Sequence, residues 1–298
     1  MKLIESKAEY IPQEEGLEGV YKQVELAGRT AYHSLDKITP TSAKDFVDRM
    51  IKSKHGACLE HGTIYLYSQY GHHIGDYKYN PYSIIDWRYP THVEATKRGI
   101  EGWYITTNLR VLYENNWLDD LKYICSPTEP HEKRYTMRFT CSRAIAQELT
   151  RHRVFSFLME SQRYINYSKE RHGGEITFIA PASFPNMLEQ YQNHFPDKLT
   201  QPEIALLECL RSTEHYYMHL LKDGYTPQQA RDVLPNATKT ELIMTGFSSD
   251  WRFLMDLRLF EKTGRVHPDM LDLMQKAQKA MQEAGIWEDI MSKPSKFD

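Results

Sequence analysis

Apolar residues recur at helical spacing in two segments near the N-terminus. In residues 17–28 they fall three or four positions apart, and residues 43–51 repeat this pattern after Pro40. Such a stripe is typical of a helix that buries one face against a core. The sequence therefore predicts two amphipathic helices joined by a turn, the second of which ends near His55.

Alternation of apolar and polar positions predicts strands later in the chain. The three segments are residues 63–67, 135–140 and 175–180. The pair Gly173-Gly174 marks a turn before the last of them. Residues 103–113 and 115–124 lack clear alternation, and we interpret both as helical.

Helical patterns dominate the second half of the chain. The clearest start is a capping box formed by Thr200 and Glu203, ahead of a long apolar stripe that runs to Gly224. The segments with such patterns are 142–150, 200–224, 226–234, 238–246, 250–261 and 268–284. The sequence therefore predicts an α/β (α+β) fold. We expect a single compact domain over residues 1–298, with a small mixed or antiparallel sheet and a largely helical C-terminal half.

Composition and charge limit the possible functions. The 298 residues are 41% apolar, and 37 basic against 40 acidic residues leave a net charge of -3. A chain so nearly neutral has no general attraction for nucleic acid or an anionic membrane, so any anion site must be local. The cysteines lack C-x-x-C or zinc-like spacing, and we find neither an apolar signal segment nor a run of about 20 apolar residues. We therefore expect a cytoplasmic protein with free cysteines.

Two histidines and a glutamate stand just before the first predicted strand. His55, Glu60 and His61 are close in sequence, but two histidines six positions apart match no zinc spacing. We interpret the segment as a turn from helix to strand with hydrogen-bonded histidines. No metal site is predicted.

Residues 151–164 combine cationic side chains with an apolar middle. Arg151, His152 and Arg153 are followed, after seven residues, by Ser161 and then by Arg163-Tyr164. Guanidinium groups bind phosphate through paired charge-assisted hydrogen bonds, so the mixture predicts a buried or half-buried anion pocket. Arg151 and Arg153 can converge on one ligand only if the preceding helix ends near His152, because in a continuing helix they lie roughly 200° apart. The plain alternative is an exposed basic helix face.

The spacing of Arg-His-Arg, Ser and Arg-Tyr resembles the signature of the flavin-dependent thymidylate synthases. Arg231 ahead of Val-Leu-Pro and Arg258 at the end of Asp-Leu-Arg also match that family. The resemblance implies reductive methylation of dUMP to dTMP, with methylenetetrahydrofolate as one-carbon donor and FAD reduced by NADPH. It also implies a homotetramer with sites shared between subunits, and it makes the tyrosine-rich residues 68–134 an insertion relative to smaller members.

The resemblance assigns roles to individual residues. Arg258 is the catalytic cation that faces the uracil ring, and Ser161 binds substrate because it has no adjacent base to make it a nucleophile. The residues assigned to dUMP are Glu148, Arg151, Glu160, Ser161, Gln162, Arg163 and Arg231. The residues assigned to FAD are His55, Arg151, His152 and Arg153.

The chain departs from the family pattern at Met159 and Phe253, where relatives carry polar residues. Phe253 can stack on a flavin but cannot donate a hydrogen bond to it. The alternative function is a non-catalytic nucleotide- or RNA-binding protein that uses the Arg-His-Arg cluster. The many tyrosines favour this alternative, because bases stack on aromatic rings, and the net charge disfavours it.

Overall fold

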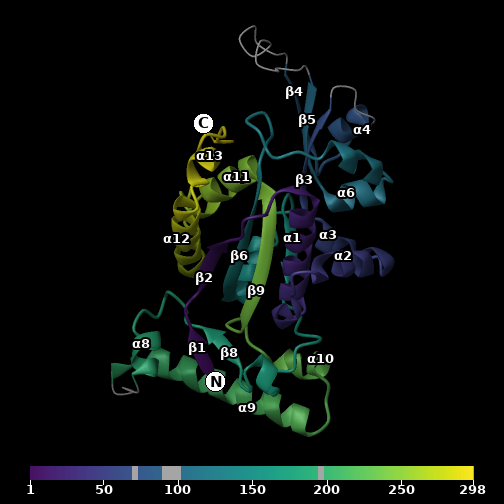
Figure 1. Ribbon diagram of the computed structural model, residues 1–298. Helices are drawn as coiled ribbons and strands as arrows, with labels where there is room; N and C mark the ends of the chain where they lie inside the picture. The colour runs from purple at the N-terminus through teal and green to yellow at the C-terminus, as the bar shows by residue number, and fades with distance from the viewer. Residues whose placement is uncertain (69–72, 89–101, 194–197, 298) are drawn as a thin grey trace.

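The computed structural model describes residues 1–68, 73–88, 102–193 and 198–297. Its central element is a four-stranded antiparallel sheet in the order β2-β6-β9-β7 (Figure 1). The strands are β2 Lys7–Tyr10, β6 Arg134–Ser142, β7 Ser156–Met159 and β9 Lys239–Phe247. The two long strands pair over their whole length, from Arg134 opposite Phe247 to Ser142 opposite Lys239.

Helices cover both faces of this sheet. On one side lie α11 Ser248–Arg258, α12 Pro268–Glu283 and α13 Trp287–Met291, and on the other lies α1 Gly16–Ala31. Phe139 of β6, Met244 of β9 and Trp251 of α11 are fully buried in the core between the sheet and α11–α13. Burial of such side chains contributes about 1.5–3 kcal/mol each and holds α11 to the sheet.

A second antiparallel sheet, in the order β3-β5-β4, lies beyond α1. Its strands are β3 Thr63–Ser68, β4 Ile84–Arg88 and β5 Gly102–Asn108. The helices with it are α2 Ser42–Lys52, α3 Gly56–Leu59, α4 Ile74–Tyr79, α6 Leu109–Glu114 and the 3₁₀ turn Leu118–Tyr123. Ile64 and Ile105 of this sheet share one core with Val20 and Val24 of α1.

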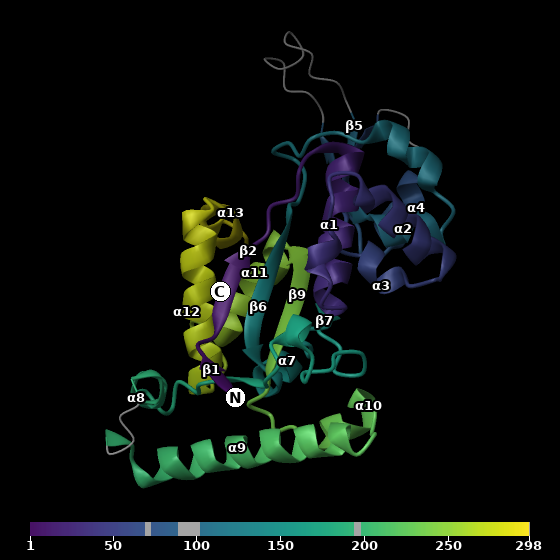
Figure 2. The ribbon, with the colours of Figure 1, turned by 60° about the horizontal axis from the view of Figure 1, so that its bottom comes forward.

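A third group of elements lies at one end of the molecule, below the central sheet in Figure 2. The parallel pair of β1 Lys2–Ile4 and β8 Thr177–Ile179 packs on the long helix α9 Gln201–Lys222. The shorter elements here are 3₁₀ turns at Glu170–His172 and Arg231–Val233, with α8 Met187–Gln192 and α10 Pro227–Ala230. A further 3₁₀ turn, Leu35–Lys37, links α1 to α2. The Thr200–Glu203 capping box predicted from the sequence opens α9.

Most of the predicted elements are confirmed, and two predictions are wrong. Residues 238–246 form the central strand β9 and not a helix, and residues 103–113 begin as strand β5 before turning into α6. Strand β9 is covered on both faces, so its apolar residues run on without the alternation that marks a strand with one face in water. In β5 the buried positions include the polar residues Thr106, Thr107 and Asn108, which removes the alternation in another way. The mixed α and β fold class is confirmed.

Gly246 of β9 tests how tightly the central core is packed. A Cβ placed on Gly246 would lie 2.3 Å from the Phe155 ring, which itself packs edge-on against Trp251. We therefore expect Gly246→Ala to lower the free energy of unfolding by about 1–3 kcal/mol in urea titrations. The matched control is Gly75→Ala in α4, where a Cβ meets nothing within 4 Å and should be neutral or mildly stabilising. Equal stability of the two variants would contradict this account.

Candidate functional site

Helix α7, Arg143–Leu149, ends where the Arg-His-Arg motif begins. The Ser142 side chain caps its start by accepting a hydrogen bond from the Ile145 N–H, and the His152 N–H donates to the Leu149 carbonyl beyond its end. The prediction that the helix ends near His152 is therefore confirmed. His152 is half-buried as a result, whereas Arg151 and Arg153 are exposed in the single chain.

Three of the predicted site residues meet at the end of α11. Arg258 donates from Nε to Nε2 of His152 at 3.2 Å, and its Nη1 lies 3.8 Å from Oε2 of Glu148. Because Nε2 of His152 is the acceptor, the ring proton of the neutral imidazole belongs on Nδ1. Burial, followed by the charges of Arg258 and Arg151, lowers the pKa of His152 to about 4. His152 is therefore a neutral acceptor near pH 7 that fixes the orientation of the Arg258 guanidinium.

A second group of predicted residues follows β7. Glu160 is buried, and its Oε2 accepts hydrogen bonds from Lys239 Nζ at 3.0 Å and from the Glu241 N–H at 3.1 Å. The Ser161 N–H donates to the carbonyl of Ala31, the last residue of α1. Gln162 is only 8% exposed, and its Nε2 has no hydrogen-bond partner among the described residues. The Gln162 side chain lies against the buried Tyr167 hydroxyl, whose pKa is raised by burial and lowered to a lesser extent by Gln162.

The two remaining arginines of the nucleotide set lie nearer to α9. Arg163 is exposed, its Nε lies 3.2 Å from Oε1 of Gln228, and its guanidinium packs over the Tyr164 ring at 5.5 Å. Arg231 is half-buried at the end of α10 and makes no ion pair within the described residues. Both therefore retain the capacity to bind a phosphate.

His55 and His61 have different environments. His55 is exposed, with Nδ1 3.4 Å from the Tyr32 hydroxyl, and the Tyr32 ring in turn lies 6.3 Å from that of Tyr164. His61 is fully buried, its Nδ1 is 2.8 Å from the Thr245 hydroxyl, and burial lowers its pKa to about 3. His55 is thus available to a ligand, and His61 is a core residue.

Lys239 and Tyr32 are site neighbours that the sequence analysis missed. The position of Lys239 was not predicted because its segment was interpreted as a helix. In a strand, residues 239 and 241 project to the same face, which is the signal that would have placed Lys239 beside Glu241 and Glu160. Tyr32 lies next to a predicted turn, where the sequence alone does not predict which residues it contacts.

The cationic side chains of the Arg-His-Arg segment and the exposed rings of Tyr32 and Tyr164 are the kinds of group that bind an aromatic, phosphorylated ligand such as a flavin nucleotide. Within the described residues no three His, Cys, Asp or Glu side chains are placed to hold a metal ion. In the same part of the chain, no helix has the length and apolar character needed to span a bilayer.

Comparison with known proteins identifies the family. Residues 126–284 match the family model described as thymidylate synthase complementing protein (Thy1). That match covers more than half of the chain and includes the motif, Arg231 and Arg258, so the chain belongs to this family. The resemblance seen in residues 151–164 is therefore confirmed.

Individual relatives match over shorter stretches. The chain is similar to flavin-dependent thymidylate synthases of Pyrococcus abyssi, with 30% identity over 41% of this chain and 44% of that one, and of Corynebacterium glutamicum, with 32% identity over 40% and 47%. The matched segment thus spans less than half the length of either relative. A UMP/dUMP methylase from Streptomyces cacaoi, solved with 5-Br dUMP, aligns over 97% of this chain and 93% of that one, with 15% identity and a TM-score of 0.42.

The contact between His152 and Arg258 predicts a measurable pKa change. Arg258→Met should raise the pKa of His152 above about 4, because it removes the nearest cation while the burial remains. Histidine NMR signals followed from pH 7 to pH 3 would measure it. Arg151→Met should raise the pKa by less, and Arg153→Met, which changes no charge acting on His152, should leave it in place. A larger effect from Arg153 than from Arg258 would contradict the geometry.

Proposed function

We propose that the chain is a flavin-dependent thymidylate synthase that converts dUMP to dTMP. Methylenetetrahydrofolate is the one-carbon donor in this proposal, and NADPH is the reductant. The observation that carries it is the set of Arg258, His152 and Glu148, which joins the Arg-His-Arg motif to the end of α11 inside the family match. FAD, when bound, supplies the redox chemistry, while the protein provides orientation and charge.

Arg258 is the catalytic cation in this proposal. For C5 of uracil to act as a nucleophile, negative charge must build up on the ring oxygens and N3, and a fixed cation there lowers the barrier because it is oriented beforehand. His152 and Glu148 hold the guanidinium through Nε and Nη1, which leaves Nη2 without a hydrogen bond or ion pair among the described residues and available to the ring. A neutral His152 does this without adding a second positive charge.

The proposed nucleotide contacts come from the residues that follow β7 and from the two arginines near α9. Arg231 and Arg163 bind the phosphate, while Ser161 and Gln162 provide donors to the sugar or base. Lys239 is a positioning residue, because its ion pair holds the buried Glu160 side chain in place beside Ser161. His55, Arg151, His152 and Arg153 are the flavin contacts in this proposal, together with the aromatic surface of Tyr32.

The exposure of two arginines of the Arg-His-Arg motif suggests how subunits assemble. Arg151 and Arg153 are exposed in a single chain, and we propose that a neighbouring subunit covers them in a homotetramer with shared sites. We further propose a cytoplasmic location, which four free cysteines suit. Residues 68–134, which supply β4 and β5 of the second sheet, are an insertion in a single domain over residues 1–298.

The proposed activity is tested directly with the purified protein. We expect flavin absorbance, and dTMP formation from dUMP only when both methylenetetrahydrofolate and NADPH are present. Folded protein that binds no flavin would contradict the proposal. Salt-dependent RNA binding by such flavin-free protein would instead support the alternative function.

The role of Arg258 is tested by replacing it with lysine. Arg258→Lys keeps the charge but loses the planar fork that His152 and Glu148 orient, so turnover should fall by about 10²–10³-fold while FAD remains bound. The matched control is Arg252→Lys on the same helix, where the ion pair to Asp256 can be kept and activity should be unchanged. Normal turnover in Arg258→Lys would remove the assigned role.

A further inference from the structure

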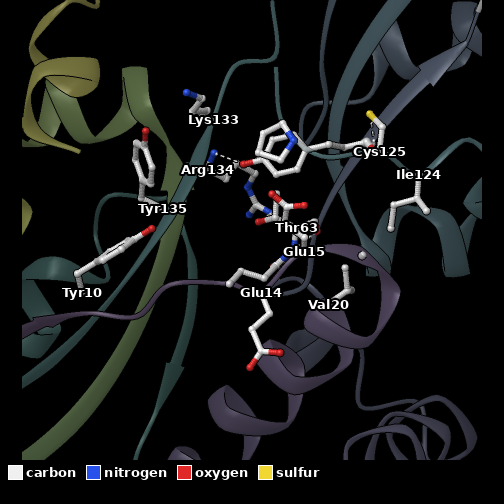
Figure 3. A pocket seen from close by; sticks show the side chains of 14 residues that line it. Tyr10, Glu14, Glu15, Val20, Thr63, Ile124, Cys125, Lys133, Arg134 and Tyr135 are labelled. Atoms are coloured by element: carbon white, nitrogen blue, oxygen red, sulfur yellow. Dashed lines mark hydrogen bonds between the residues drawn. The ribbon is translucent and has the colours of Figure 1, made fainter. Parts of the chain in front are cut away.

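A cavity of about 180 Å³ lies between the central sheet, the start of α1 and the second sheet (Figure 3). Its walls come from the loop before α1, from β3 with the segment after the 3₁₀ turn 118–123, and from the start of β6. It exceeds by about tenfold the ~10–15 Å³ that one water needs. None of the candidate site residues named above is among the described residues that line it.

Two cations, Arg134 and Lys133, line this cavity, and neither forms an ion pair within the described residues. Arg134 is 8% exposed and donates to the Glu60 carbonyl at 3.1 Å and to Ser156 Oγ at 3.3 Å, but its Nε is unpaired within the described residues. Burial lowers the pKa of Arg134 to about 10, which leaves it charged at neutral pH. The Glu60 carboxylate is already paired with Arg110. Lys133 is half-buried and makes no ion pair in the described part of the chain.

Two phenols add hydrogen-bond donors to the same wall. The Tyr65 hydroxyl accepts from the Arg134 N–H at 3.1 Å, so its own proton points elsewhere. The Tyr10 hydroxyl has no partner among the described residues, and burial raises the pKa of both phenols, that of Tyr65 to about 12. Both therefore remain O–H donors at neutral pH.

The acceptors around the cavity are mostly occupied. Glu14 is exposed and paired with Lys22 at 2.7 Å, and Glu15 is exposed and accepts from Ser126 Oγ at 2.5 Å. The Gln13 side chain both donates to and accepts from the Thr63 backbone at 2.8 Å. The two cations and two phenols on the wall formed by β2, β3 and β6 therefore keep free donors, whereas the two carboxylates of the lining stand at the exposed rim and already accept hydrogen bonds.

We propose that this cavity binds a small oxyanion, the carboxylate or phosphate group of a metabolite, between Lys133, Arg134 and the hydroxyls of Tyr10 and Tyr65. Each charge-assisted hydrogen bond contributes roughly 1.5–3 kcal/mol, which is about a tenfold to hundredfold gain in affinity. The bound anion adds a hydrogen-bonded counter-charge beside the buried Arg134, on which the carboxylates of Glu60 and Asp250 already act from a distance. It also connects the central sheet to the second sheet, because its partners come from both.

The test is calorimetric titration of the full chain with inorganic phosphate and, separately, with succinate. Lys133→Met should weaken binding by about tenfold or more, because one charge-assisted bond is lost. Glu15→Gln should tighten binding several-fold, because it removes a repelling carboxylate at the rim. The matched control is Lys122→Met, which removes the same charge from an exposed position outside the cavity lining and should change affinity by less than about twofold.

The opposite responses of Lys133 and Glu15 separate this site from anion binding elsewhere, since binding at the Arg-His-Arg segment would leave both variants like wild type. Lys133→Met replaces a side chain without a bonding partner, and an unchanged melting temperature would verify its fold. Binding of phosphate alone identifies a phosphorylated ligand, and binding of succinate alone a carboxylate. Failure of both probes with wild-type protein, or wild-type affinity in both variants, would overturn the proposal.

Discussion

The antiparallel pairing of β6 with β9 is the constraint on which the rest of the site depends. Helix α7 follows the end of β6 and helix α11 follows the end of β9, so the two helices start at opposite ends of the paired strands. Seven helical residues of α7 and eleven of α11 together extend about 27 Å, close to the length of a nine-residue strand. Glu148 and Arg258, at the far ends of the two helices, consequently meet.

Any slip in this register would separate the two helix ends. A shift of one residue also exchanges the faces of each strand, which would turn Phe139 and Met244 away from the core that they form with α11 and toward the face covered by α1. The buried core therefore fixes the strand register and, through it, the distance between Glu148 and Arg258. The cross-strand ion pair of Lys239 with Glu160 adds a second restraint, at the edge of the sheet where β7 ends.

Much of the site could be predicted from the sequence because its motif combines local chemistry with local structure. The end of α7 near His152 could be predicted, since two arginines on either side of one histidine converge only where a helix stops. The contact between His152 and Arg258 could not be predicted, because it spans more than 100 positions and depends on strand pairing. Strand β9 was misjudged because burial on both faces removes the alternation that identifies strands, and Lys239 was lost with it.

The chain enters the second sheet and returns to the central sheet at nearly the same point. Arg134 at its exit donates to the carbonyl of Glu60 at its entrance, so the ends of the intervening 60–134 segment are held together. A loop closed in this way can change length during evolution at little entropic expense, since the surrounding backbone need not move. The limit is set by Val20 and Val24 of α1, which share a core with this sheet. A shorter version of the chain would need another apolar cover for them, which an adjoining subunit could provide.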